Sequence, residues 1–167
     1  TMKLQHQIVH SNILNSVDGI LSENITDYKY YKGVAPNTPV HTIPTLIIED
    51  NLLDARNENK QDKTMVGGNC SNWYGGFDSY VVAQEFDMPI YAPSMGRKID
   101  REEEMDIKHY PYMTWVEWMN ALSEIHVGVH MMPTHAAGTF ALNCAYWGIP
   151  CIGYRGLDTQ EELHPHC

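Results

Sequence analysis

The stretch IHVGVHMMPTHAAGTFALNCAYWGIPCIGY, residues 125–154, decides the fold of this chain. Alternation around Val127 and Val129 predicts a buried strand, and a loop then leads into apolar residues at helical spacing. Gly148 ends that helix, and residues 150–152 predict a second buried strand. The stretch is therefore one strand–helix–strand unit of about thirty residues, the size that such a unit needs.

Small residues fill the turn before this predicted helix. Ala136, Ala137 and Gly138 keep side chains away from the point where the first backbone N–H groups of the helix face the loop. Unpaired donors and the positive end of the helix dipole favour an anion there. The alternative is that small residues only let the helix pack closely on its sheet.

Strands and helices alternate from residue 64 onward. Apolar runs predict strands over residues 64–66, 88–92 and 107–112, followed by the two strands of the opening stretch. Residues 72–86 predict a helix with a weak point at Gly75-Gly76. Two helices have start signals: Asn24 to Thr26 before residues 27–32, and Thr114, with Glu117 three residues later, before the helix that follows residue 112. Five such strands indicate an α/β fold, a Rossmann-like parallel sheet in the order 3-2-1-4-5 with helices on both faces. Strands 1 and 4 are then neighbours at the switch point, so the turns at residues 67–69 and 133–139 face one cleft.

The first part of the chain predicts the end of a second α/β domain. Residues 2–17 suit a helix, Ile20 and Leu21 a short strand, residues 27–32 a helix, and residues 40–44 a strand. The polar block at residues 49–63 predicts a linker. The expected organisation is residues 1–48, the linker at 49–63, and a Rossmann-like domain over 64–167.

Composition limits the classes of partner. Eleven basic and twenty-one acidic residues give a net charge of −10, which argues against non-specific nucleic-acid binding. The four cysteines lack the paired short spacings of a metal or disulfide framework, which predicts reduced core residues in a cytoplasmic protein. The sequence contains no apolar run of about eighteen residues, so we expect no membrane span.

Residues 64–163 resemble the C-terminal, nucleotide-sugar-binding domain of GT-B glycosyltransferases. Many retaining members of that family carry a Glu, two residues, a Gly, four residues, a second Glu, and later a Gly-x-Pro before a buried strand. Gly138 and the Gly-Ile-Pro at residues 148–150 are in register with that pattern. His135 and Asn143 stand at the two acidic positions, and both side chains retain hydrogen-bonding groups.

The resemblance implies a nucleotide-sugar donor, such as a UDP-sugar or GDP-sugar, bound without a metal or another cofactor. It places the donor diphosphate at the Gly138 turn, the sugar at His135, the ribose at Asn143 and the nucleobase at Tyr112, with Gly68 and Asn69 facing the sugar or phosphate. The full donor-binding set that it implies is Gly68, Asn69, Tyr112, His135, Ala137, Gly138, Thr139 and Asn143. It identifies no catalytic residue in this chain.

The same resemblance implies that the chain is the donor-binding part of a glycosyltransferase. Residues 1–48 would close an N-terminal, acceptor-type domain whose remainder is a missing partner. We expect the chain alone to be inactive. The acceptor, which is a glycan, a lipid-linked sugar or a small molecule, and any homo-oligomer stay open.

Two other functions remain as alternatives. Replacement of both acidic positions, at His135 and Asn143, suits a non-catalytic domain that binds a nucleotide or phosphate ligand. A dinucleotide-dependent oxidoreductase needs a glycine-rich spacing after strand 1, which residues 67–72 do not show, although Asp87 lies near the expected place of a ribose ligand.

A metal site is not expected. Residues 126 and 130 lie roughly 13 Å apart along a strand, too far for His126, His130 and His135 to converge on one ion. The terminal His-Pro-His-Cys at residues 164–167 supplies ligand types, but nothing in the sequence predicts a second shell around them. We interpret Trp115 and Trp118 as core or domain-interface residues.

Overall fold

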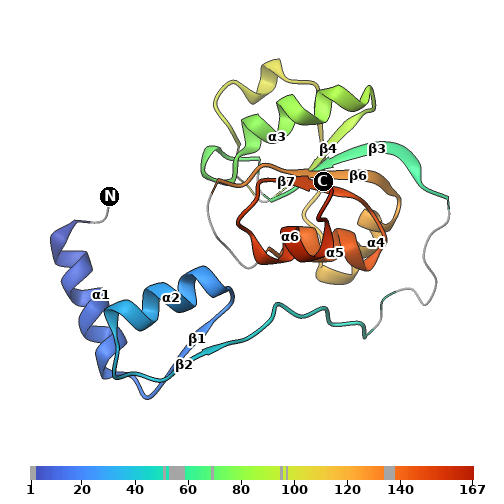
Figure 1. Cartoon of the computed structure of the whole chain (residues 1–167). Coiled ribbons are helices and arrows are strands. Elements are labelled where there is room, and N and C mark those ends of the chain that lie inside the picture. The colour runs from blue at the N-terminus through green and yellow to red at the C-terminus, as the bar shows by residue number, and fades with distance from the viewer. Residues whose placement is uncertain are drawn as a thin grey trace. The chain divides into compact units, whose positions relative to one another are not determined.

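The computed structural model describes residues 3–50, 52, 59–68, 70–94, 96, 98–133 and 138–167. These residues form two compact units, residues 3–46 and residues 47–133 with 138–167. Each unit is described by itself below (Figure 1). In the described part of the chain, we find no helix with both the length and the apolar character to span a membrane.

The N-terminal unit is small and alternates helix with strand, as predicted. Its sheet has two parallel strands, with Ile20 opposite Val40, and its core consists of Leu14, Ile20, Ala35 and Val40. The Asn24 side chain accepts a hydrogen bond from the Asp27 backbone N–H at 2.8 Å, which confirms the predicted cap. The elements are α1 (Leu4–Ser16), β1 (Ile20–Ser22), α2 (Ile25–Val34) and β2 (Val40–Thr42).

The C-terminal unit is a parallel α/β sheet. The strand order β5-β4-β3-β6-β7 is the predicted order 3-2-1-4-5, and every pair is parallel. Its elements are β3 (Gln61–Val66), η1 (Asn72–Tyr74), α3 (Gly76–Ala83), η2 (Gln84–Phe86), β4 (Ile90–Pro93), η3 (Glu102–Glu104), β5 (Ile107–Tyr110), α4 (Trp115–Ser123), β6 (Ile125–His130), α5 (Thr139–Tyr146), β7 (Cys151–Gly153) and α6 (Asp158–Leu163).

Helices cover both faces of this sheet. In Figure 1, α3 lies on one face, and α4, α5 and α6 lie on the other. Successive residues of β3 point to opposite faces, so Met65 packs in the core under α4 and α5 while Val66 packs in the core under α3. Both side chains are fully buried, as expected for a strand that has helices on both faces.

Capping fixes the start of α4 as predicted. The Thr114 side chain accepts from the Glu117 backbone N–H, and Glu117 accepts from the Thr114 backbone N–H at 2.8 Å. This reciprocal capping box satisfies two donors that the helix itself leaves free. The backbone and hydroxyl hydrogen bonds from Thr114 hold the pKa of Glu117 below its usual value.

Several element boundaries differ from the sequence prediction. Strand β3 begins at Gln61, inside the predicted linker, because the Gln61 N–H donates to the Glu124 carbonyl at 2.8 Å and the residue pairs with Ile125. The helix predicted over residues 72–86 is interrupted at Gly75, whose φ is +66°, which is where the weak point was predicted. Helix α6 was not predicted, since its sequence DTQEEL has no apolar periodicity.

The cysteines are free, as predicted, but they do not share one environment. Cys70, Cys144 and Cys151 are buried, whereas Cys167 is exposed, so the expectation that all are core residues is wrong for Cys167. Cys167 follows the end of α6 in a turn closed by its N–H and the His164 carbonyl, and this turn lies on the surface.

Candidate functional site at the switch point of the sheet

Strands β3 and β6 end side by side. They are parallel neighbours, with Val66 opposite Val129. The turn at Gly67 and Gly68 and the loop that follows His130 therefore leave from the same edge of the sheet, which we call the switch edge. Ligands of open α/β sheets bind at this kind of edge, where successive connections run in opposite directions. The predicted adjacency of strands 1 and 4 is confirmed, and a cleft between the two turns stays a prediction.

Gly67 brings the β3 turn against helix α5. Its N–H donates to the Val129 carbonyl at 2.8 Å, which extends the ladder by one residue. A Cβ atom at this position would lie 2.5 Å from the Phe140 ring, inside the contact distance of real atoms. Only glycine fits there, because the Phe140 ring occupies the space that a side chain needs.

Gly75 joins the connection after β3 to the segment after β6. A Cβ at Gly75 would lie 1.8 Å from the Met131 carbonyl oxygen, and the φ of +66° favours glycine independently. The Met131 N–H also donates to the Ser79 hydroxyl at 2.9 Å. These contacts hold the chain in place directly after His130.

His130 is the polar side chain buried at this edge. Its residue exposure is 9%, its ring packs edge-on against Phe140 with centroids 5.6 Å apart, and Nε2 has no hydrogen-bond partner among the described residues. A Cβ at Gly68 would lie 3.0 Å from this Nε2. Burial lowers the pKa of His130 to about 4, so the imidazole is neutral at pH 7.

Sequence reasoning considered His130 only as a metal ligand and missed its place beside Gly68. The available signal was its position as the last residue of a buried central strand, because a polar residue at such a strand end faces the ligand edge. His126, on the same strand, is exposed instead and lies 3.8 Å from Asp62. Within the described ranges, no group of three His, Cys, Asp or Glu residues is placed to hold a metal ion.

Gly138 precedes α5 and is held by α6. Its φ is +67°, and its carbonyl accepts from the Thr159 hydroxyl at 3.1 Å. A Cβ at this position would overlap Thr159, so packing already accounts for glycine here. Among the described residues, none accepts a hydrogen bond from the N–H groups of Thr139, Phe140 or Ala141. The Thr139 amide stays a candidate anion donor.

Asn143 lies inside the protein. It is 3% exposed. With its amide in the orientation that satisfies both atoms, the nitrogen donates to the Thr139 carbonyl at 3.0 Å and the oxygen accepts from Trp118 Nε1 at 3.2 Å. The side chain thus ties α5 to α4. Its predicted contact with a ribose requires that these bonds be exchanged for bonds to the ligand, and it stays a prediction.

We expect Asn143→Leu to lower the free energy of unfolding by about 2 kcal/mol, because it takes away the amide oxygen that accepts from the Trp118 N–H and the side-chain bond to the Thr139 carbonyl. Chemical denaturation measures this. In a cycle with Trp118→Phe, the double variant should lose about 1 kcal/mol less than the sum of the single variants. Strict additivity would contradict the Asn143–Trp118 bond.

The other predicted donor residues divide into three groups. Tyr112 follows β5 and is 82% exposed, so the alternative of core packing is excluded and the ring is free to face a nucleobase. Gly68 and Thr139 lie at the switch edge. Asn69, His135 and Ala137 lie outside the described residues.

A buried carboxylate holds the connection after β4. Glu102 is bound to His109 Nε2 at 2.6 Å and accepts from the Ile99 N–H at 3.1 Å. Burial, with Glu102 nearby, raises the pKa of the Cys70 thiol to about 12. Cys70 therefore stays protonated, and it is unsuited to act as a nucleophile.

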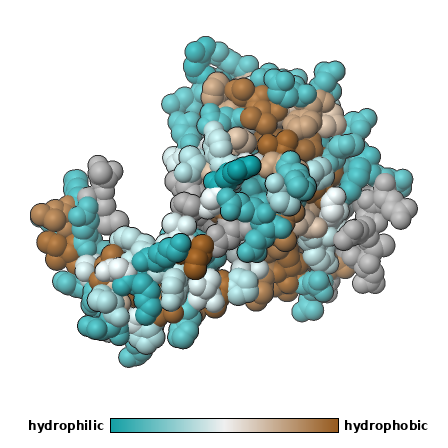
Figure 2. Space-filling view, in the orientation of Figure 1, coloured by the Kyte–Doolittle hydropathy of each residue, from teal (hydrophilic) through white to brown (hydrophobic). Residues whose placement is uncertain are grey.

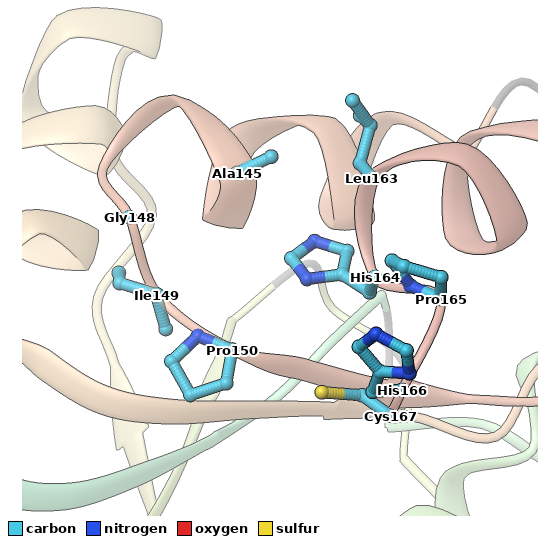
Figure 3. Close-up of a pocket in the computed structure, with 9 residues that line it drawn as sticks. All are labelled: Ala145, Gly148, Ile149, Pro150, Leu163, His164, Pro165, His166 and Cys167. Carbon is cyan, nitrogen blue, oxygen red and sulfur yellow. The ribbon is translucent and has the colours of Figure 1, made fainter.

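A shallow pocket of about 370 Å³ lies elsewhere (Figure 3). It is lined mainly by residues before β7 and after α6, and Pro150, His166 and Cys167 lie in the lower half of the view. Pro150 precedes β7, so this pocket is at the amino ends of the strands. It is not part of the switch edge.

Solved glycosyltransferase structures are similar to this chain. AviGT4, a glycosyltransferase involved in avilamycin A biosynthesis, is 13% identical with a TM-score of 0.64, over 87% of this chain and 47% of its own. The sucrose-phosphate synthase of Thermosynechococcus elongatus is 15% identical with a TM-score of 0.67, over 96% and 48%. The pneumococcal O-GlcNAc transferase GtfA, solved with UDP and GlcNAc, is 12% identical with a TM-score of 0.64, over 90% and 33%.

The fold is that of GT-B glycosyltransferases. This confirms the fold that the motif around Gly138 predicted. The chain spans between a third and a half of the length of these three structures. No family model matches the sequence, and no curated protein matches it either.

Proposed function

We propose that this chain is the donor-binding part of a glycosyltransferase that moves a sugar from a nucleotide-sugar to an acceptor. The observation that carries the proposal is the switch edge of a GT-B fold, where the β3 turn, His130 and the start of α5 meet. Parallel sheets bind nucleotides at this edge because the helix amides there point outward.

The donor would be oriented by both sides of the switch edge. The amides at Ala137, Gly138 and Thr139 would hold the diphosphate, and Gly68, Asn69 and His135 would face the phosphate or the sugar. Preorganised donors of this kind stabilise the charge that develops on a leaving diphosphate, without a metal ion. Tyr112, exposed at the end of β5, would stack on the nucleobase, and Asn143 would reach the ribose.

The N-terminal unit supports a division into two domains, with residues 1–48 closing an acceptor-type domain, a linker that ends before β3, and a donor domain that begins with β3 at Gln61. A parallel sheet of only two strands ordinarily continues into further strands with covered faces. Here Leu21 of β1 is 64% exposed, and apolar residues of α1, including Leu4 and Ile8, are exposed as well (Figure 2). The partner that we propose for this surface is the remainder of the acceptor domain.

A binding titration tests the proposal. We expect calorimetry to show that the chain binds UDP-sugars or GDP-sugars and the corresponding nucleoside diphosphates, and that NAD binds much more weakly. Tyr112→Ala should weaken nucleotide binding about tenfold through loss of base stacking. The matched control Tyr30→Ala removes an exposed tyrosine of the N-terminal unit and should leave the affinity for nucleotides unchanged. Preference for NAD would contradict the proposal.

A non-catalytic binding domain is the second candidate. It is favoured by Asn143, which stands at an acidic position of the family pattern and is already bound to Trp118 and Thr139. Both candidates predict that the purified chain transfers no sugar by itself. They differ once the missing acceptor domain is supplied, when only the first predicts turnover of the donor.

A further inference from the structure

His130 differs from the other buried histidine of the C-terminal unit. His164 accepts from the Cys151 N–H at 3.3 Å through Nδ1, and its Nε2 lies 2.9 Å from the Ala141 carbonyl. Both of its ring nitrogens are thus satisfied, as expected for a structural histidine. His130 Nε2 is equally buried but has no partner in the described part of the chain.

An unpartnered buried nitrogen destabilises the fold, so its place in the structure needs a reason. His130 is the last residue of β6 and lies beside Gly68, the turn residue after β3. The atoms nearest to a Cβ at Gly68 are His130 Nε2 at 3.0 Å and carbons of His130 and Tyr74 at 3.6 Å. Nε2 is therefore the polar atom that faces the β3 turn of the switch edge.

The surroundings of the ring decide which ligand group it suits. One side of the ring meets the apolar Phe140. Because burial lowers the pKa of His130 to about 4, the ring offers a neutral imidazole and no positive charge for a phosphate. A neutral nitrogen suits a hydroxyl, which can both donate and accept a hydrogen bond.

We propose that His130 Nε2 hydrogen-bonds a hydroxyl of the donor sugar at the switch edge and is a specificity residue for the sugar rather than for the diphosphate. This inference rests on the proposed function. The Gly68 turn covers Nε2, so it shifts when the sugar binds. Gly68 carries no side chain that would anchor the turn, which makes such a shift easier.

The direct test uses the unaltered chain with ¹⁵N-labelled histidine. We expect addition of a UDP-sugar or GDP-sugar to shift the Nε2 resonance of His130, and addition of the matching nucleoside diphosphate to leave it in place. The resonances of His164 should not move with either ligand. Sugar binding that leaves the His130 resonance unchanged would overturn the inference alone.

Variants give the second measurement. His130→Phe keeps the ring and its packing, and it should weaken nucleotide-sugar binding about tenfold while changing nucleoside diphosphate affinity less than about twofold. His130→Gln should restore part of the sugar affinity, and the control His126→Phe, on the same strand but exposed, should have no effect. Equal losses for both ligands would overturn the inference. If neither ligand class binds the unaltered chain, the proposed function fails and this inference fails with it.

Discussion

Gly75→Ala is expected to lower the free energy of unfolding of the C-terminal unit by about 4 kcal/mol. Two effects add. An alanine at a φ of +66° is strained by about 1 kcal/mol, and its Cβ would lie 1.8 Å from the Met131 carbonyl oxygen. That oxygen belongs to the backbone, so no side-chain rotation relieves the overlap. Urea denaturation followed by circular dichroism measures the loss.

Gly96→Ala is the matched control for this variant. Gly96 has a φ of +70°, almost the same as Gly75, but among the described residues other than its chain neighbours no atom lies within 4 Å of the Cβ position. Its replacement should lower the free energy of unfolding by only about 1 kcal/mol, the conformational part. Equal losses in the two variants would show that the approach of Gly75 to Met131 contributes nothing.

The same contact matters for the ligand site. Gly75 and Ser79 hold Met131, the residue directly after His130. A shift of this segment would move the His130 ring relative to Gly68. Gly75→Ala should therefore weaken donor binding under conditions in which the unit is still folded, whereas Gly96→Ala should not.

Hydropathy patterns were sufficient to predict the sheet. Val127 and Val129 on β6, and the apolar residues that end β3, are buried because parallel strands have helices on both faces. Such strands therefore stand out in the sequence by their apolar residues. Right-handed crossovers then left few possible strand orders, and the observed order is one that the switch-point rule favours. Caps at Asn24 and Thr114 were equally local and were predicted correctly.

Long-range polar contacts were not predictable in the same way. Nothing near Asn143 in the sequence indicates Trp118 as its partner, and α6 is held by contacts such as the Gln160 side-chain bond to the Cys151 carbonyl at 2.6 Å. Such contacts depend on the packing of separate elements rather than on periodicity. That His130 Nε2 has no partner among the residues that the structure describes is visible only after that packing is known.

The burial of His130 also sets a dependence of stability on pH. Its pKa is about 4 in the folded protein and near 6.5 in an unfolded chain. Between these values the unfolded state binds more protons than the folded state, so protonation favours unfolding as the pH falls. The contribution of the neutral His130 ring to the free energy of unfolding is fully present above about pH 6.5 and is lost progressively as the pH falls to about 4. The difference between the two pKa values corresponds to about 3 kcal/mol.

The free energy of unfolding falls between pH 7 and pH 4, and His130→Phe is therefore expected to make this fall smaller by about 3 kcal/mol. At pH 7 the variant should be more stable by about 1 kcal/mol, because it no longer buries an unpartnered nitrogen. Denaturant unfolding at a series of pH values measures both effects, and His126→Phe controls for an exposed histidine of the same strand. Carboxylates titrate alike in all three proteins, so the difference between the profiles isolates His130. Parallel profiles for His130→Phe and the unaltered protein would mean that a protonated His130 is accommodated in the folded state, and a neutral, sugar-facing imidazole would then be wrong.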